Sequence, residues 1–235
     1  MEFLTFTPIT KKDKFATSKK ENYCMIKKLT FLLFTFITIT SYAQEATTDS
    51  ITANGHKLLQ LLDSSRVEEL WQKGYRVNWE TGEQETASSN PASTHCSAFA
   101  AAFSKKVGIY LLRPPEHKQA LLANAQFDWL QTYNAANEGW VKVNSGLEAQ
   151  NLANKGYLVV TVFKNADEHK PGHIAVIRPA IKTMKKLNRE GPQTTQSGAT
   201  NAYSIALIDG FSHHPGAWPD GVIFYEHPID WANIK

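Results

Sequence analysis

The sequence predicts a single α+β domain in which N-terminal helices pack on an antiparallel sheet. Apolar residues at helical spacing dominate the chain to about residue 156, and runs rich in β-branched residues follow. Helices first and strands afterwards favour segregated layers over alternating βαβ units. A chain of 235 residues is long enough to bury one full core and short for two domains.

The N-terminal 43 residues have the composition of a leader. Residues 1–24 are polar and Lys-rich, and we expect a non-native or misassigned extension there, because Met25 opens a better start. In residues 25–43 two lysines precede an apolar run and small residues follow it, a pattern typical of a secretory signal peptide. The apolar run is short for a membrane anchor, so we expect an exported protein, periplasmic or extracellular, with no stable membrane span after cleavage.

The mature protein that this cleavage predicts begins with a flexible terminus, residues 44–54, and continues as one domain over residues 55–235. The chain carries 25 Lys and Arg against 22 Asp and Glu, of which the leader holds 7 and 3. The remaining 18 basic and 19 acidic residues give a net charge of −1, without the basic stripe that nucleic-acid binding needs. Cys24 falls in the leader, so the exported domain keeps only Cys96, which must be buried, paired between chains, or used chemically.

The helices are predicted from apolar spacing and capping residues. Leucines recur at helical spacing before Asp63 and residues 65–68 form a capping box, which indicates two short helices or one that is broken. Residues 75–91 have no sustained period, and we expect a loop there that bounds a cleft. Further helices are predicted over residues 96–106, over 116–123 with Pro115 in the first turn, and over 146–153 with Ser145 as N-cap.

Strands are predicted where β-branched residues concentrate. Residues 157–163 and 173–177 carry the strongest pattern, and the short polar loop between them indicates an antiparallel hairpin. Residues 182–190 are expected to form a polar excursion from the sheet. Further strands are predicted over residues 193–196, 203–208 and 222–225.

A nucleophile and a base are predicted at the ends of two of these elements. With Ser93 or Thr94 as N-cap, the Cys96 thiol lies in the first helical turn, where unpaired N–H groups and the helix dipole favour a thiolate. His173 begins a strand directly after a Pro-Gly turn, and its imidazole suits the deprotonation of a thiol. Adjacent residues at a helix start face different ways, so we do not expect His95 to be the base.

Two segments carry a resemblance to a known family. They are His95-Cys96-Ser97-Ala98-Phe99 at the helix start and Gly172-His173-Ile174-Ala175-Val176 at the strand start, with a helix and strand over residues 149–160 between them. Their order resembles the NlpC/P60 and CHAP superfamily of papain-like peptidoglycan hydrolases, over about residues 93–208. The resemblance implies a papain-like fold and a cysteine amidase or endopeptidase that acts on peptidoglycan stem peptides, with no cofactor.

The resemblance also implies a third polar residue, on the strand after the histidine, that orients the imidazole. Gln196 and Asn201 are the two candidates, because a side-chain carbonyl can accept from the ring N–H. We favour Gln196. A glutamine at this place departs from the family, which often has an acid, Asn or His there.

The substrate would also meet groups outside this set. The backbone N–H of Cys96 is the expected first donor of an oxyanion hole, and Asn90 or Asn78 is a candidate for the second. Trp129 and Trp140 are candidate walls of the substrate groove, with core packing as the alternative role.

The predicted function is an exported cysteine hydrolase that cleaves amide bonds in peptidoglycan stem peptides. Asp209, His213 and His214 suggest a metal site, but they lack the better-spaced third ligand that zinc normally needs, so we predict no metal. Two alternatives stay open. One is a non-catalytic cell-wall or glycan-binding module in which Cys96 is a buried small hydrophobe, and the other is a secreted amidase toxin, which would have an immunity protein as partner.

Overall fold

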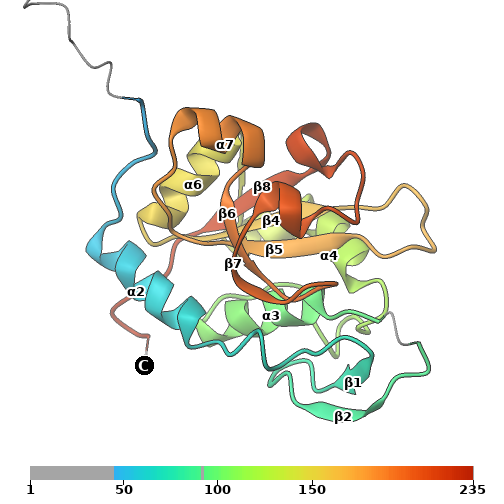
Figure 1. Cartoon of the computed structure of the whole chain (residues 1–235). Helices are drawn as coiled ribbons and strands as arrows, with labels where there is room; N and C mark the ends of the chain where they lie inside the picture. The colour runs from blue at the N-terminus through green and yellow to red at the C-terminus, as the bar shows by residue number, and fades with distance from the viewer. Residues whose placement is uncertain (1–44, 91–92, 235) are drawn as a thin grey trace, which may run out of the picture. The chain divides into compact units, whose positions relative to one another are not determined.

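A computed structural model of the chain describes residues 45–90 and 93–234, and the predicted extension (1–24) and signal peptide (25–43) lie outside this described part. The described residues form an α+β fold around a six-stranded antiparallel sheet in the order β3-β8-β4-β5-β6-β7, beside a separate β1-β2 hairpin (Figure 1). The strands are β1 Tyr75–Val77, β2 Gln84–Ala87, β3 Val141–Val143, β4 Leu158–Phe163, β5 His173–Ile177, β6 Gln193–Gln196, β7 Ala202–Ala206 and β8 Ile223–His227. The helices are α2 Ala53–Asp63, α3 Cys96–Lys106, α4 Leu122–Leu130, α5 Tyr133–Asn137, α6 Gly146–Asn154, α7 Met184–Glu190, α8 Leu207–Gly210 and η1 Ala217–Gly221.

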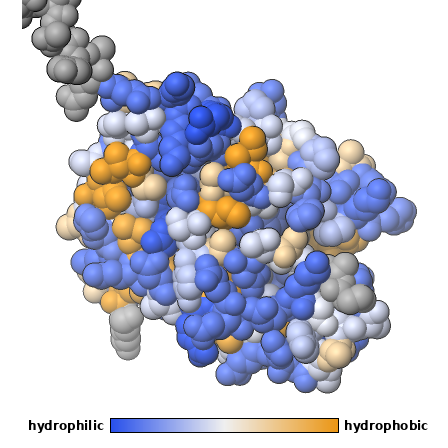
Figure 2. Space-filling model, in the orientation of Figure 1, coloured by the Kyte–Doolittle hydropathy of each residue, from blue (hydrophilic) through white to orange (hydrophobic). Residues whose placement is uncertain are grey.

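Helices cover both faces of the sheet, which explains why β4 and β5 are buried along nearly their whole length. Alternate residues of a strand point to opposite faces. Val160 and Val176 accordingly belong to the hydrophobic cluster that contains α3, whereas Val159 and Ala175 belong to the one that contains α6. In Figure 1, α6 and α7 lie above the sheet and α3 below it. Figure 2 shows that hydrophilic residues cover most of the same face of the molecule, with hydrophobic residues in separate patches.

The predicted helix at Cys96 is confirmed with the expected bounds, Cys96–Lys106. Its N-cap is His95 rather than Ser93 or Thr94, and no side chain caps it, so Cys96 is the first helical residue. Every residue from Cys96 to Ser104 is buried. The alanines of this stretch let α3 lie close against β5, and this packing carries the start of the helix to the start of the strand.

Two helical predictions in the first half are wrong. The capping box at residues 65–68 opens no helix, because Arg66 and Trp71 adopt positive φ angles of 55° and 53° that interrupt helical geometry; α2 ends at Asp63. Residues 116–121 form turns, and the helix predicted over 116–123 starts instead at Leu122. The helix starts where burial begins. Leu122 and most of the residues that follow it in α4 are at least partly buried, whereas residues 116–121 are mainly exposed.

The loop predicted over residues 75–91 contains the β1-β2 hairpin. The two strands are three and four residues long and almost wholly exposed, so they carry no alternating pattern that the sequence could reveal. The hairpin is tied to the domain at its turn, where the Trp71 ring nitrogen donates to the Trp79 carbonyl (3.1 Å) and Trp71 N–H donates to the Gly82 carbonyl (2.8 Å).

The second half follows the prediction more closely. The strands at residues 157–163, 173–177, 193–196 and 222–225 correspond to β4, β5, β6 and β8, and β4 and β5 pair as the predicted antiparallel hairpin. Ser145 is confirmed as an N-cap, since its hydroxyl accepts from Glu148 N–H (3.1 Å), but the Glu148 carboxylate accepts from Asn144 N–H (3.1 Å) rather than from Ser145 as a capping box requires. The polar excursion contains α7, the predicted strand at 203–208 ends at Ala206 and continues as α8, and β3 was not predicted.

The stretch predicted as a flexible terminus, residues 44–54, makes specific contacts in its described part. Thr47 forms an isolated bridge with Thr183, Thr48 N–H donates to the Lys182 carbonyl (2.9 Å), and α2 already starts at Ala53. Among the described residues, no helix combines the length and apolar character that crossing a bilayer requires.

The packing of α3 gives a stability prediction. Phe99 is 1% exposed, and its ring meets that of Trp71 edge to face at 5.2 Å. We expect Phe99→Ala to lower the free energy of unfolding by about 3–5 kcal/mol, since it leaves a cavity and removes an aromatic contact. Urea denaturation would measure the loss. Tyr133→Ala is the matched control, because Tyr133 is 79% exposed and its loss should cost less than about 0.5 kcal/mol. Equal losses in the two variants would contradict the described core.

Candidate functional site

The predicted thiol and imidazole come from elements that meet. Cys96 is the first residue of α3, His173 is the first residue of β5, and each side chain is 4% exposed. The backbone N–H groups of Ile174, Ser97 and Cys96 itself lie near enough to the sulfur to lower the pKa of the Cys96 thiol. Because Ile174 directly follows His173, the sulfur lies beside the strand position that carries the imidazole. Within the described residues, no hydrogen bond joins Sγ to the His173 ring.

A hydrogen bond to Gln196 sets the tautomer of His173. The distance from His173 Nε2 to Gln196 Oε1 is 2.9 Å. The Gln196 amide nitrogen donates to the carbonyls of Thr200 (3.2 Å) and Gly210 (3.3 Å), so it is the amide oxygen that must face the ring. A carbonyl oxygen can only accept, and Nε2 therefore carries the proton. In the neutral ring this leaves the lone pair on Nδ1, which is available to take a proton from a thiol.

The imidazole is enclosed on its other sides. The Phe211 ring contacts it edge to face at 4.5 Å, and the His214 ring stacks parallel to it at 5.4 Å with an interplanar angle of 11°. Gly198 leaves room for the ring: a Cβ there would come within 3.0 Å of His173 Cε1. This close packing holds the ring in one orientation.

Burial governs the protonation of both groups. It raises the pKa of the Cys96 thiol, although the three backbone N–H groups offset part of the effect. It also lowers the pKa of His173 to about 4, against a smaller opposite effect of the Gln196 hydrogen bond. At neutral pH the pair is therefore a thiol and a neutral imidazole rather than an ion pair.

Two cavities flank the start of α3 and share Thr94 in their walls. One, of about 240 Å³, is lined by His173 together with Lys73, Thr94, Pro171, Gly172, Ala199, Gly210, His213 and His214. The other, of about 460 Å³, lies toward the β1-β2 hairpin and includes Tyr75, His95, Ser97 and Gln119 in its lining. His95 is not placed as a base, because its Nε2 is bonded to the Tyr75 carbonyl (2.9 Å). Cys96 itself lines neither cavity, although its neighbours His95 and Ser97 line the larger one.

Of the two candidates for the third polar residue, only Gln196 contacts the imidazole. The Asn201 amide nitrogen donates instead to the carbonyls of Val67 (2.8 Å) and Leu70 (2.9 Å), and its oxygen accepts from Gly198 N–H (2.9 Å). Asn201 thus ties the loop after β6 to the segment that follows α2.

The candidate substrate-binding residues are not gathered at the site. Trp140 is 3% exposed, and its ring nitrogen donates to the Tyr110 carbonyl (2.7 Å), so it packs the core; Trp129 packs edge to face on Tyr110 at 5.5 Å. Neither tryptophan lines either cavity, and Asn90 does not line them. Asn78 lies in the hairpin turn, where its side-chain oxygen accepts from the N–H groups of residues 80 and 81.

Sequence reasoning missed several residues that surround the imidazole. Lys73 and Phe211 lie in no recognisable sequence motif, and His214 was considered only as a metal ligand. Its neighbour Pro215 and the glycines nearby did indicate a loop, but nothing in the sequence said that this loop folds onto His173. Within residues 45–90 and 93–234, no three His, Cys, Asp or Glu side chains are grouped in a way that could hold a metal ion.

The burial of His173 predicts how stability depends on pH. Its pKa of about 4 in the folded protein lies below the ordinary value of 6.5, so the unfolded chain takes up this proton first as the pH falls. The associated stability is complete above about pH 6.5 and is lost progressively toward pH 4, by about 3 kcal/mol in total. Urea denaturation across this range should show that the free energy of unfolding falls less in His173→Asn than in the wild-type protein. Identical pH profiles for the two proteins would contradict the buried neutral ring.

Comparisons with known proteins do not add to this geometry. No protein-family model matches the chain, and no curated protein matches it. The arrangement of Cys96, His173 and Gln196 is therefore the basis on which a function is assigned.

Proposed function

We propose that this chain is an exported cysteine hydrolase of papain-like type that cleaves amide bonds in peptidoglycan stem peptides. The observation that carries the proposal is the arrangement around His173: Nε2 is held by Gln196 at 2.9 Å, Nδ1 keeps its lone pair, and the backbone N–H of the next residue, Ile174, lies near enough to the Cys96 thiol to lower its pKa. Peptidoglycan as substrate and export as destination rest on the NlpC/P60-like motifs and the leader pattern described above.

The proposed reaction uses both groups. Nδ1 of His173 takes the thiol proton as the Cys96 sulfur attacks the amide carbonyl, and the imidazolium then gives that proton to the leaving amine. A thioester on Cys96 and a free amine result. Water, deprotonated by the same Nδ1, attacks the thioester and releases the carboxylic acid, which restores the thiol and the neutral ring.

The start of α3 would stabilise the negative charge that forms on the carbonyl oxygen. The first N–H groups of a helix have no partner within the helix, and the helix dipole adds to their attraction for an anion. The Cys96 N–H is in this position. Such donors are among the largest contributions to amide hydrolysis, because they are already aligned when the charge appears.

One observation favours a different interpretation. A buried cysteine with a raised pKa is also what a structural, unreactive thiol would show. A non-catalytic cell-wall or glycan-binding module is therefore the alternative function, and a secreted amidase toxin would use the same chemistry as the proposed enzyme. Activity of site variants separates the enzyme from the binding module.

Replacement of the proposed nucleophile or base should abolish hydrolysis. We expect Cys96→Ala and His173→Ala to reduce release of soluble peptides from isolated peptidoglycan by about 10³-fold or more, as measured by liquid chromatography and mass spectrometry. His56→Ala is a matched control, because this histidine is exposed on α2, far along the chain from the site. Circular dichroism would verify the fold of each variant. Undiminished release by Cys96→Ala would falsify the proposal, and so would a wild-type protein that releases nothing.

The roles of the two amide residues should separate in one experiment. Gln196→Leu removes the acceptor for Nε2, so we expect kcat to fall by roughly 10²-fold because the ring can adopt the wrong tautomer or orientation. Asn201→Leu leaves two backbone carbonyls without their donor, so it should lower the free energy of unfolding by about 1–3 kcal/mol and spare kcat of the folded enzyme. The reverse pattern would show that Asn201, and not Gln196, orients the imidazole.

A further inference from the structure

The smaller cavity lies on the side of the site that receives the leaving group, if the proposed function holds. In that mechanism the imidazolium of His173 protonates the leaving amine, and a proton is transferred only across a hydrogen bond. The residue that carries the amine must therefore sit next to the His173 ring. The cavity of about 240 Å³ has this ring as part of its wall.

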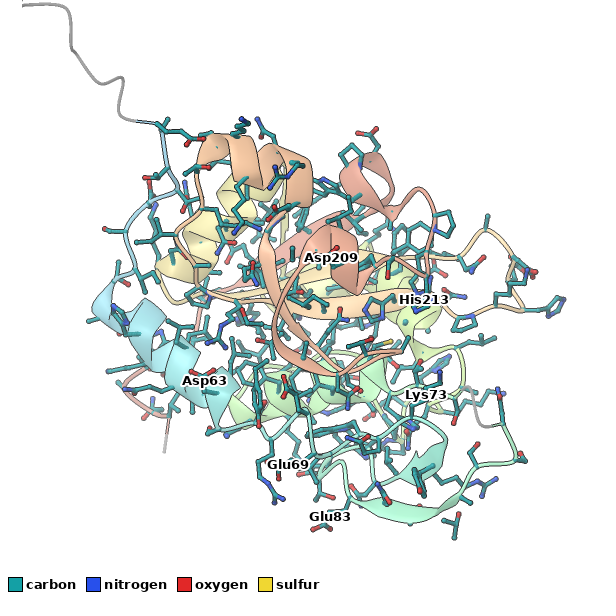
Figure 3. The ribbon with its side chains drawn as sticks, viewed as in Figure 1. Asp63, Glu69, Lys73, Glu83, Asp209 and His213 are labelled. Carbon is teal, nitrogen blue, oxygen red and sulfur yellow. The ribbon has the colours of Figure 1, made fainter. Side chains whose placement is uncertain are left out.

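The lining of this cavity has a distinct charge. Lys73, His213 and His214 are its titratable members besides His173, and no Asp or Glu is among its lining residues. Lys73 is exposed and makes no ion pair or hydrogen bond through its ammonium group within the described part of the chain. Figure 3 shows Lys73 and His213 on the same side of the molecule, with Lys73 below His213 in the view, and both residues line the cavity.

The remaining walls are small, which leaves Lys73 and the two histidine rings accessible. Gly172, Ala199 and Gly210 contribute little or no side chain. A Cβ at Gly210 would meet the Gln196 amide, and one at Gly172 would meet the Phe163 carbonyl and the Asn124 side chain, so both positions require glycine. A volume of about 240 Å³ is below the range of pockets for drug-sized ligands and suits a group of about one amino-acid residue.

We infer that this cavity is the subsite for the leaving residue and that it selects a residue with a free carboxylate. Lys73 supplies the positive charge, and the ring N–H groups of His213 and His214 supply further donors for the carboxylate oxygens. The larger cavity differs, since Arg76 and Glu85 both line it and give it charges of both signs. It would take the acyl side of the substrate, with less demand for an anion.

The first test compares two substrates with the full mature chain. They are soluble muropeptides that differ only at the leaving residue, which bears a free carboxylate in one and a carboxamide in the other. We expect the wild-type protein to prefer the carboxylate, and Lys73→Met to reduce kcat/KM for it by about three- to tenfold while the carboxamide changes less than about twofold. Lys185→Met is the matched control, because Lys185 is exposed on α7 and lines neither cavity. Equal rates for the two substrates, or an equal effect of Lys73→Met on both, would overturn the inference and leave the proposed hydrolase intact.

The second test does not depend on hydrolysis. In the Cys96→Ala protein, NMR titration with D-alanine should shift the ring resonances of His213 and His214 at millimolar concentration, whereas D-alaninamide should not. Lys73→Met should weaken this binding by about three- to tenfold. If no peptide is cleaved at all, the proposed function fails, and the titration still decides whether the cavity binds a carboxylate. Absence of binding, or equal binding of the amide, would overturn the inference.

Discussion

The orientation of one buried amide fixes the chemistry of this site. Gln196 is 1% exposed, and its nitrogen is committed to two backbone carbonyls, so its oxygen can only face Nε2 of His173. To turn the amide over would set its NH₂ group against the ring N–H and leave the two carbonyls without a donor, at a cost of about 1–3 kcal/mol for each unsatisfied buried group. The tautomer of the imidazole is thus set by the Gln196 amide on β6, which the backbone around Gly210 holds in one orientation. A Cβ at Gly210 would come within 2.5 Å of the amide oxygen, which links this glycine to the orientation of the amide through packing alone.

The same close packing that brings Cys96 to His173 also determines their protonation. An alanine-rich α3 approaches β5 closely, and the first residue of each element is then 4% exposed. Removal from water disfavours the charged form of both groups, which raises the pKa of the thiol and lowers that of the imidazole. The closeness of Cys96 to His173 and the neutral state of both groups therefore have the same cause, the close packing of α3 on β5. A less buried helix start would favour the thiolate but would lose the contact with the Ile174 N–H and the fixed position of the sulfur.

Elements with a strong local pattern were predictable from the sequence, and those that depend on tertiary contacts were not. The bounds of α3, β5 and β6 were predicted because small residues, β-branched residues and glycine punctuation mark them directly. Gln196 could be favoured over Asn201 from its place on the strand after His173, and the structure adds its contact with the imidazole. Lys73 could not be predicted, since it reaches the cavity only through the turns that replace the expected helix after Asp63. The two tryptophans failed as substrate contacts because an aromatic residue in a sequence does not reveal whether it faces a groove or the core.

In the proposed hydrolase the pair starts neutral, so the N–H groups at the start of α3 would stabilise the negative charge and no pre-formed thiolate would be needed. If Sγ gave up its proton before attack, the cleft would hold two separated charges in a site that excludes water, and burial opposes both of them. If proton transfer accompanies attack, the negative charge passes at once from sulfur to the carbonyl oxygen. In the proposed mechanism that oxygen would lie where the N–H groups of the first helical turn can bind it, and the imidazolium would stay next to the Gln196 carbonyl oxygen, which would stabilise its Nε2–H. The proposed mechanism therefore has the substrate supply the acceptor that allows the charges to form, with the thiol protonated until an amide carbonyl is bound.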